Sequence, residues 1–267
     1  EIAKELLSET GVAIIHMDEN ELYNLGLLLA NSVFGEKNDL GIMVWNKLNP
    51  KGDAKGVASM HEYILCYAKN RGAFLELKNT LNRPKPNAVS IIDKANKLFS
   101  KIGNKTIPDE IKEIIKPFNY SKDIIEDFIV EYDLKLVNKE FQAWLDRQNF
   151  SGGEKAYKFI DNNGIVFQSV SMAWPNKEKA PDEYFIPLKH PITGKDCPVP
   201  KRGWRNPPDT MQKLLENGGT ETLYDGTVCK GEILFGKDEK KQPRRKYILK
   251  ENMFENTPSI FANGSSD

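Results

Sequence analysis

The sequence predicts a mixed α/β fold, and three observations lead to this prediction. Short apolar, β-branched runs alternate with a helical pattern over residues 1–80. Residues 81–155 change to apolar positions with helical spacing, and residues 156–250 change again to short strand-like runs among many prolines and glycines. We therefore expect an α/β core, a helical insertion, a β-rich module and a return to the core at residues 251–267.

The α/β core begins with a strand and a helix. Gly11–Met17 (GVAIIHM) is a short apolar run typical of a buried strand. Asp18 or Asn20 is a suitable N-cap for the helix that follows, which should run to about Val33 and end at Gly35. Its predicted apolar face consists of Leu22, Leu25, Leu28 and Leu29.

Two further strands are predicted in the core, at Ile42–Trp45 and His61–Lys69. The residues between them, 49–59, are rich in turn formers and should form a loop. Lysines occur just before this loop at Lys47 and within it at Lys51 and Lys55. The loop is suited either to contact DNA phosphates, with Lys51 at its centre, or simply to lie in solvent.

The helical insertion is predicted from apolar stripes between residues 91 and 149. Three groups of positions follow helical spacing: Ile111, Ile114, Ile115 and Phe118; Ile124, Ile125, Phe128, Ile129 and Tyr132; and Phe141, Trp144 and Leu145. Such stripes far more often pack in a core than bind a ligand, so we interpret them as packing surfaces.

The β-rich module is predicted from four strand-like runs separated by turn residues. These runs are Ile165–Met172, Tyr184–Leu188, Glu232–Phe235 and Lys246–Leu249. Neither a repeat of 20–50 residues nor a long low-complexity tract is visible in the sequence.

Charge is unevenly distributed along the chain. Lys+Arg and Asp+Glu both number 38, so the net charge says nothing about partners. The first 80 residues hold 8 basic and 11 acidic side chains, whereas residues 151–250 hold 18 and 13. A basic stripe beside a slightly acidic body suits a polyanion binder, and it suits a lysine-rich solvated surface equally well.

The three cysteines and the hydropathy exclude several classes of protein. Cys66, Cys197 and Cys229 are odd in number and widely spaced, which supports neither a zinc site nor a disulfide framework and suits a reducing cytoplasm. We expect no signal peptide and no membrane span, because no run of about 18 apolar residues occurs.

One basic block, Lys195–Arg205, combines cations with an aromatic ring. Lys201, Arg202 and Arg205 surround Trp204. Guanidinium groups can contact guanine or phosphate in a bidentate manner, and a neighbouring aromatic ring can stack on a base. These residues are therefore candidate DNA contacts, with burial in the core as the equal alternative for Trp204.

Three stretches share a pattern with one known family. They are Gly11–Gly35, Ser59–Asn70 (SMHEYILCYAKN), and Tyr184–Trp204 (YFIPLKHPITGKDCPVPKRGW) together with Phe235–Glu251 (FGKDEKKQPRRKYILKE). These stretches resemble the modification (Mod) subunits of type III restriction–modification systems, which are DNA adenine methyltransferases. The first resembles the strand and helix that follow the catalytic motif, and the second is similar to a later strand of the same enzymes. The third is the most specific match and resembles the DNA-recognition region.

This resemblance implies both a fold and partners. It implies that the core is part of a Rossmann-like methyltransferase sheet, and that the β-rich module recognises the DNA target. It further implies transfer of a methyl group from S-adenosylmethionine to adenine N6 in double-stranded DNA, assembly as a Mod homodimer, and a restriction (Res) subunit as partner.

The resemblance also adds a second group of candidate DNA contacts in the block that follows Phe235. Gln242 is a possible adenine reader, and the surrounding cations suit phosphates or guanine. The group consists of Lys237, Lys241, Gln242, Arg244, Arg245 and Lys246.

The family's two signature motifs do not occur in the sequence. No Asp-Pro-Pro-Tyr type motif is present, and Asn206-Pro207-Pro208 is followed by Asp209 rather than by an aromatic residue. No Phe-x-Gly-x-Gly loop is present for the cofactor. We expect the chain to be an internal fragment that binds S-adenosylmethionine weakly or not at all. The alternative is a DNA-binding protein without catalysis.

Two histidines remain as candidates for the core. His61, at a predicted strand start, either lines a target-base pocket or is a structural hydrogen-bonding residue. His16 lies in an apolar strand, and we expect a hydrogen-bonded core residue there.

Overall fold

The fold is described from a computed structural model for residues 1–48, 56–77, 81–117, 126–257 and 259–262. The chain divides into two compact units. The terminal unit consists of Glu1–Lys85 and Phe254–Asp267, and the central unit consists of Pro86–Met253. Both contain helices and strands, so the predicted mixed α/β character is confirmed.

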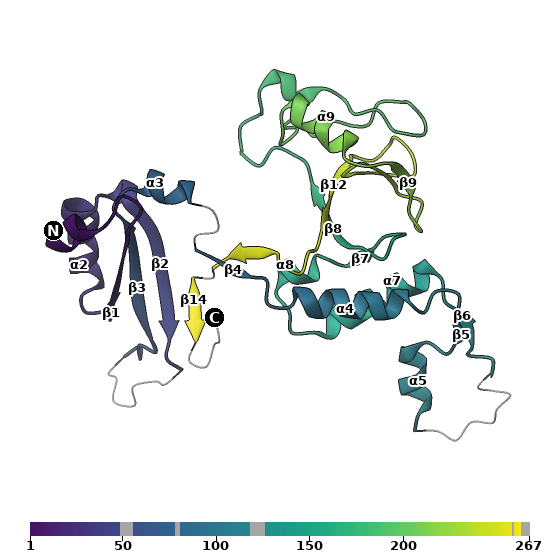
Figure 1. Ribbon diagram of the computed structural model, residues 1–267, viewed down its shortest axis with the longest axis horizontal. Coiled ribbons are helices and arrows are strands. Elements are labelled where there is room, and N and C mark those ends of the chain that lie inside the picture. Colours follow the sequence, from purple (N-terminus) through teal and green to yellow (C-terminus); the bar gives the residue numbers. More distant parts are fainter. Residues whose placement is uncertain (49–55, 78–80, 118–125, 258, 263–267) are drawn as a thin grey trace. The chain divides into compact units, whose positions relative to one another are not determined.

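The terminal unit contains a four-stranded sheet with the order β1-β3-β2-β14 (Figure 1). The strands are β1 (Val12–Met17), β2 (Asp39–Asn46), β3 (His61–Ala68) and β14 (Ile260–Ala262). Strand β3 pairs antiparallel with both β1 and β2, while β14 pairs parallel with β2. The three strands predicted in residues 1–80 are therefore confirmed.

The predicted helix after β1 is also present, in two segments. Helix α2 (Leu22–Leu28) continues into one wider π-helical turn (Leu29–Val33), and the chain turns at Gly35, whose φ of +84° few other residues adopt. Helix α2 packs on one face of the sheet, where the cluster of buried side chains consists of Met17, Leu29, Phe34, Leu65 and Tyr67. A short helix, α1 (Ile2–Leu6), precedes the sheet.

The rest of the terminal unit joins segments distant in sequence. Helix α3 (Arg71–Glu76) follows β3 and is capped by the side chain of Asn70, which accepts a hydrogen bond from the Ala73 amide. Strand β4 (Asn82–Pro84) pairs with β13 (Phe254–Asn256), and Glu255 forms ion pairs with Arg83 and Lys85.

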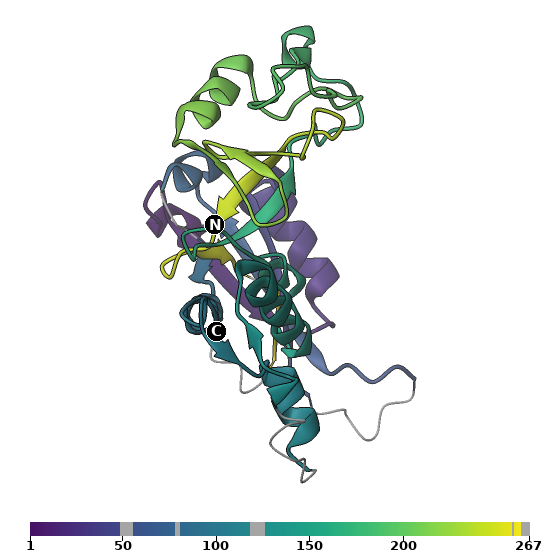
Figure 2. The ribbon, with the colours of Figure 1, turned by 90° about the vertical axis from the view of Figure 1, so that its right-hand side faces the viewer.

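The central unit begins with two helices that pack side by side, α4 (Ala88–Phe99) and α7 (Leu134–Arg147) (Figures 1 and 2). Their contact buries Ile91, Ala95, Leu98, Val137, Phe141 and Leu145, which confirms the packing role predicted for the stripe Phe141–Leu145. Helix α5 (Asp109–Ile115), predicted from its isoleucines, and the two-stranded pair β5 (Lys105–Thr106) and β6 (Val130–Glu131) lie between them in sequence.

The helix predicted over 124–132 is wrong from residue 127 onward. Residues 118–125 lie outside the described residues, and Val130–Glu131 form strand β6. Tyr132 is buried, and its hydroxyl donates a hydrogen bond of 2.6 Å to the carboxylate of Glu140 on α7. Pairing of the backbone with the segment 103–106 brings Tyr132 to that carboxylate and overrides the local helical spacing.

The second half of the central unit is a six-stranded sheet with the order β7-β8-β12-β11-β10-β9, in which all neighbours are antiparallel. Its strands are β7 (Phe159–Ile160), β8 (Val166–Ser171), β9 (Thr220–Thr222), β10 (Val228–Lys230), β11 (Ile233–Phe235) and β12 (Arg244–Ile248). Three of the four strand-like runs are thus confirmed, at β8, β11 and β12.

The fourth run, Tyr184–Leu188, is wrong as a strand. It begins as the 3-10 turn η3 (Asp182–Phe185), flanked by Pro181 and Pro187, and proline cannot donate to a strand ladder. The Tyr184 carbonyl instead accepts from the Trp204 amide, so the segment packs as a loop.

The two faces of the six-stranded sheet differ. One face packs against helix α9 (Pro208–Glu216), which lies beside it in Figures 1 and 2. The buried cluster on this α9 face includes Trp204, Met211, Leu214, Ile233 and Phe235. The opposite face, called the pocket face below, has a smaller cluster consisting of Phe167, Leu223, Cys229 and Leu234.

A buried carboxylate joins the helical part of the central unit to the short helix α8 (Gly152–Lys155). Glu154 is 2% exposed and forms a capping box with Ser151. It also accepts hydrogen bonds from the amide and side chain of Asn87, before α4. Burial acts to raise the pKa of Glu154, but these hydrogen bonds outweigh it, and the pKa falls below the ordinary 4.5.

We predict that Glu154→Gln lowers the free energy of unfolding at pH 7 by about 1–3 kcal/mol, because a charged acceptor for buried donors is lost. A lowered folded-state pKa means that the wild-type contribution is present above the ordinary pKa and is lost as the pH falls through the folded value. Urea unfolding at pH 7 and pH 4 should therefore show a smaller difference between variant and wild type at pH 4. Glu178→Gln, at an exposed position, is the control. An equal difference at both pH values would contradict this prediction.

Candidate nucleic-acid interface

The basic residues of strand β12 do not share one surface. Side chains alternate between the two faces along a strand. Arg244 and Lys246 therefore lie on the pocket face with Ser169, which pairs with Lys246, while Arg245 lies on the α9 face opposite Val170 and Ile233. The candidate DNA contacts at the end of the module thus separate into two groups.

Lys246 is a buried structural cation, so its prediction as a DNA contact is not supported by its position. Its side chain is 8% exposed, and its ammonium group lies 2.7 Å from Asp161 Oδ2 and 3.2 Å from Glu221 Oε1. Burial acts to lower the pKa of Lys246, but the hydrogen bonds that Lys246 donates to Asp161 and Glu221, together with the negative charge of Asp161, outweigh it, and the pKa is raised. The charge is therefore retained and neutralised inside the protein.

Arg245 is also held by neighbouring side chains. Its guanidinium group lies 2.9 Å from Glu232 Oε2 and donates a hydrogen bond of 2.9 Å to the Tyr247 hydroxyl. The same group lies 4.4 Å from the centre of the Tyr247 ring, in a cation–π contact. A contact between Arg245 and DNA, as predicted, would have to compete with its ion pair to Glu232 and its two interactions with Tyr247.

Trp204 belongs to the core, which was one of its two predicted roles. The side chain is 2% exposed, and its indole N–H donates to the Ile186 carbonyl at 2.9 Å. The preceding Gly203 has φ +85°, and a Cβ there would meet that of Ala180 at 2.9 Å. Only glycine fits this turn, and the turn carries the tryptophan inward.

The cations around Trp204 are exposed. Lys201, Arg202 and Arg205 all lie on the surface, and Arg202 Nη1 donates to the Asn176 carbonyl at 2.7 Å. They remain predicted DNA contacts. Lys51, predicted in the loop of residues 49–59, lies outside the described residues.

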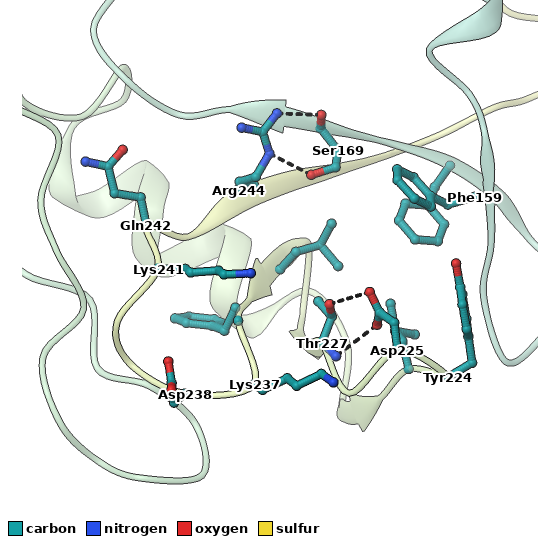
Figure 3. A pocket seen from close by; sticks show the side chains of 15 residues that line it. Phe159, Ser169, Tyr224, Asp225, Thr227, Lys237, Asp238, Lys241, Gln242 and Arg244 are labelled. Carbon is teal, nitrogen blue, oxygen red and sulfur yellow. Dashed lines mark hydrogen bonds between the residues drawn. The ribbon is translucent and has the colours of Figure 1, made fainter. Parts of the chain in front are cut away.

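Four predicted residues meet around one cavity of about 400 Å³ on the pocket face. Lys241, Gln242 and Arg244 supply its basic side, and Lys237 extends from the same loop toward the turn that carries Asp225 (Figure 3). Arg244 donates to Ser169 twice, from Nε to Oγ at 2.8 Å and from Nη2 to the carbonyl at 2.9 Å. Among the residues that the structure describes, neither Lys237 nor Lys241 has an ion-pair partner, so both charges are available to a ligand.

The opposite side of the cavity is aromatic and acidic. Phe159 and Phe167 stack with ring centres 5.5 Å apart, and Tyr224 stands beside them in Figure 3. Burial, and then the charge of Asp225, raise the pKa of Tyr224, so its hydroxyl stays protonated. Asp225 accepts from the Thr227 amide and hydroxyl, both at 2.9 Å.

A tight turn positions this aromatic and acidic side. The Leu223 carbonyl accepts from the Gly226 amide, and the Leu223 amide donates to the Thr227 carbonyl. Gly226 has φ +81°, and the aliphatic chain of Lys237 packs where its Cβ would stand. Tyr224 and Asp225 were not predicted as site residues, because no pattern in the sequence pairs this turn with Lys237–Arg244. The Asp-Gly dipeptide signals the turn but not its neighbours.

A second cavity, of about 470 Å³, lies between helix α9 and the segment Glu183–Lys189. Among the predicted site residues only Trp204 lines it, as part of its wall. Within the described residues, no group of three or more His, Cys, Asp or Glu side chains is arranged to hold a metal ion.

In the terminal unit, Glu62 pairs with two basic side chains. His16 Nε2 and Lys47 Nζ each lie 2.6 Å from one of its carboxylate oxygens. The hydrogen bond from Lys47 is the main reason that the pKa of Glu62 is lowered. His16 is 59% exposed, so the prediction of a core histidine is wrong: it lies on the face of β1 opposite α2, where a charged partner satisfies it.

His61 lies beside Tyr63 on strand β3. Its Nε2 is 2.8 Å from the Tyr63 hydroxyl, and the two rings meet edge to face with centres 5.0 Å apart. This geometry fits the alternative that His61 is a structural hydrogen-bonding residue. Its role in a target-base pocket stays a prediction.

Residues 1–192, which are more than half of the chain, match the DNA methylase family.

The chain belongs to this family.

Relatives of this family member include Mod subunits of type III restriction–modification enzymes. It is 30% identical to the EcoP15I Mod subunit from Escherichia coli over 242 residues, which are 90% of this chain and 30% of that protein. It is 46% identical to the EcoPI Mod subunit from Escherichia phage P1 over 72 residues, which are 26% of this chain and 11% of that protein. The predicted resemblance to type III Mod subunits is thereby confirmed.

A further relative is the type II methyltransferase M.KpnI from Klebsiella pneumoniae, at 27% identity over 180 residues, which are 62% of this chain and 41% of that protein. This member of the DNA methylase family therefore spans less than half the length of each of these relatives. None of its helices in the described part of the chain has the length and apolar character that a membrane span requires.

Substitution of Lys246 on β12 and of Lys241 at the cavity should change the free energy of unfolding by different amounts. We predict that Lys246→Met lowers the free energy of unfolding by about 3 kcal/mol, because it leaves the 1%-exposed carboxylate of Asp161 without its cation. Lys241→Gln, at an exposed position, should change it by less than about 0.5 kcal/mol. Urea unfolding of both variants measures this, and equal stabilities would show that the buried ion pair is not required.

Proposed function

We propose that this chain supplies DNA target recognition to a type III modification enzyme that methylates adenine N6 in a short duplex site. Membership of the DNA methylase family and the Mod relatives support the enzyme class. The observation that carries the recognition role is the cavity of the pocket face, where Arg244 converges with two lysines that have no ion-pair partner in the described part of the chain.

The arrangement of these cations suits contact with DNA. Lys237 and Lys241 are flexible point charges, which suit phosphates. Arg244 is fixed through Nε and Nη2 by Ser169, so its orientation is set before binding, and among the described residues its Nη1 has no hydrogen-bond partner. An oriented guanidinium group is suited to reading guanine or phosphate. Gln242 stands at the edge of the same cavity, and its amide donates a hydrogen bond of 3.5 Å to the Val199 carbonyl.

S-adenosylmethionine would serve the full-length enzyme rather than this chain alone. The sequence contains neither an Asp-Pro-Pro-Tyr type motif nor a Phe-x-Gly-x-Gly loop, so no residue here is assigned to the cofactor. We propose that the chain binds S-adenosylmethionine weakly or not at all. The Mod homodimer, the Res subunit and a cytoplasmic location are proposed on the same family grounds.

The terminal unit would form part of a Rossmann-like methyltransferase sheet. The domain division proposed is a core at 1–80 and 251–267, a helical insertion at 81–155 and a recognition module at 156–250. His61 would then lie in the catalytic core, with Tyr63 fixing its ring.

A binding protein without catalysis is the second candidate, and the absent motifs favour it for this chain taken alone. The two candidates make the same prediction for DNA binding and differ in methyl transfer. A longer chain that carries both motifs and transfers a labelled methyl group to duplex DNA would decide for the enzyme.

We predict that the double variant Lys237→Gln, Lys241→Gln binds duplex DNA more weakly and with a less steep dependence on salt. Each phosphate contact releases counterions and contributes about 0.9 to the slope of log K against log salt, so the slope should fall by about 1–2. Fluorescence anisotropy of a labelled duplex at about 50–200 mM salt measures this slope, because the affinity of such complexes falls strongly over this range.

The matched control for this experiment is the double variant Lys97→Gln, Lys139→Gln. Both lysines are exposed on helices α4 and α7 of the same unit, and the substitution removes the same charge. If the two double variants lost affinity equally, net charge rather than the cavity would govern binding, and the proposed interface would be wrong.

A further inference from the structure

The aromatic side of the cavity on the pocket face is not explained by contact with a DNA backbone. Phosphate contacts require only surface cations, and a paired base presents its edge rather than its ring face to a protein. Yet the cavity is lined on one side by Phe159, Phe167, Leu223 and Tyr224. A volume of about 400 Å³ lies within the range of small-ligand sites.

The two sides of the cavity differ in chemistry. Figure 3 shows Lys241 and Arg244 on one side, and Tyr224, Asp225 and Phe159 on the other. A ligand that satisfies both sides is flat and aromatic at one end and anionic at the other. A nucleotide has this chemistry, since its base can stack on a ring and its phosphate can meet cations.

We propose that this cavity binds a single unstacked nucleotide, with its base against Tyr224 and Phe159 and its phosphate on Lys241 and Arg244. This inference rests on the proposed role of the module in DNA binding. It adds that the module takes one nucleotide out of its stack, at a site formed mostly by residues 223–244, which lie beyond the match to the DNA methylase family.

Asp225 argues for a base rather than for an acidic peptide. Its carboxylate is fixed by Thr227 at the aromatic side, so it would repel a second carboxylate there. It can accept a hydrogen bond from the exocyclic amine of a base, since two hydrogen bonds leave part of its acceptor capacity free. Adenine, cytosine and guanine carry such an amine, and thymine does not.

The turn at Leu223–Thr227 holds these groups before a ligand arrives. Its two backbone hydrogen bonds, of 2.9 and 2.8 Å, fix Tyr224 and Asp225 at its tip. The stem of Lys237 packs over Gly226 and braces the turn. A preformed site loses less conformational entropy on binding than one that must be ordered.

The test uses the 267-residue chain and three probes: a fluorescein-labelled single-stranded (dA)12, a labelled duplex of mixed sequence, and free dAMP as competitor. Tyr224→Leu removes the ring, and Tyr23→Leu removes an exposed tyrosine that does not line the cavity. Thermal unfolding of each variant checks that it is folded. The exposed Lys241→Gln tests the phosphate end without disturbing the core.

We expect Tyr224→Leu to weaken binding of (dA)12 by about 10-fold or more, a usual effect of losing one stacking platform. Lys241→Gln should also weaken it, because the variant loses a phosphate contact. Tyr224→Phe, which keeps the ring, should restore the binding that Tyr224→Leu loses, and Tyr23→Leu should bind as the wild type does. If Tyr224→Leu does not fold, the loss in Lys241→Gln and competition by dAMP take its place, and their joint absence overturns the proposal.

The three probes also separate the sources of the nucleotide. Dependence of duplex binding on Tyr224 indicates an extruded base, dependence of (dA)12 binding alone indicates a single-stranded segment, and strong competition by dAMP indicates a free nucleotide. Unchanged binding of every probe by a folded Tyr224→Leu variant would overturn the proposal, as would competition by a poly-glutamate peptide in place of dAMP. Duplex binding that depends on Lys237 and Lys241 but not on Tyr224 would leave the proposed DNA interface intact.

Discussion

The six-stranded sheet of the central unit depends on one buried ion cluster. Lys246 on β12 lies between Asp161, before β8, and Glu221 on β9, so it joins the middle of the sheet to segments from both of its edges. Asp161 also accepts from the amides of Asn163 and Ile165 and thereby closes the turn between β7 and β8. A buried cation with two carboxylates costs desolvation energy, and it is tolerated because its hydrogen bonds are made.

This cluster decides which positive charges remain available. Because Lys246 is neutralised within the sheet and Arg245 lies on the α9 face with Glu232, the pocket face presents Arg244 together with the lysines of the loop before β12. A run that is strongly basic in sequence thus becomes a smaller, oriented group in space. The same alternation places Phe167 and Ser169 beside that group, which gives the cavity both an apolar floor and a fixed arginine.

Much of the fold could be predicted from sequence, and the errors have physical causes. Apolar runs predicted β1, β3, β8 and β11 because burial on a sheet demands such residues locally. Tyr132 was assigned to a helix because its partner, Glu140, acts only through tertiary contact. The site was predicted in part: Lys237, Lys241, Gln242 and Arg244 were identified from the family resemblance. Residue type alone does not reveal which face of a strand Arg245 or Lys246 occupies, because the register of the strand is unknown. Tyr224 and Asp225 reach the cavity from a distant turn, and a sequence without the fold contains no signal for that meeting.

The central claim is that DNA meets the pocket face through Lys237 and Lys241, and lysine acetylation with and without duplex DNA tests it directly. Mass spectrometry should show both lysines protected by DNA, Lys97 and Lys139 modified equally in both states, and Lys246 unreactive throughout because it is buried in its ion cluster. Equal modification of Lys237 and Lys241 in the free and DNA-bound protein would contradict the account.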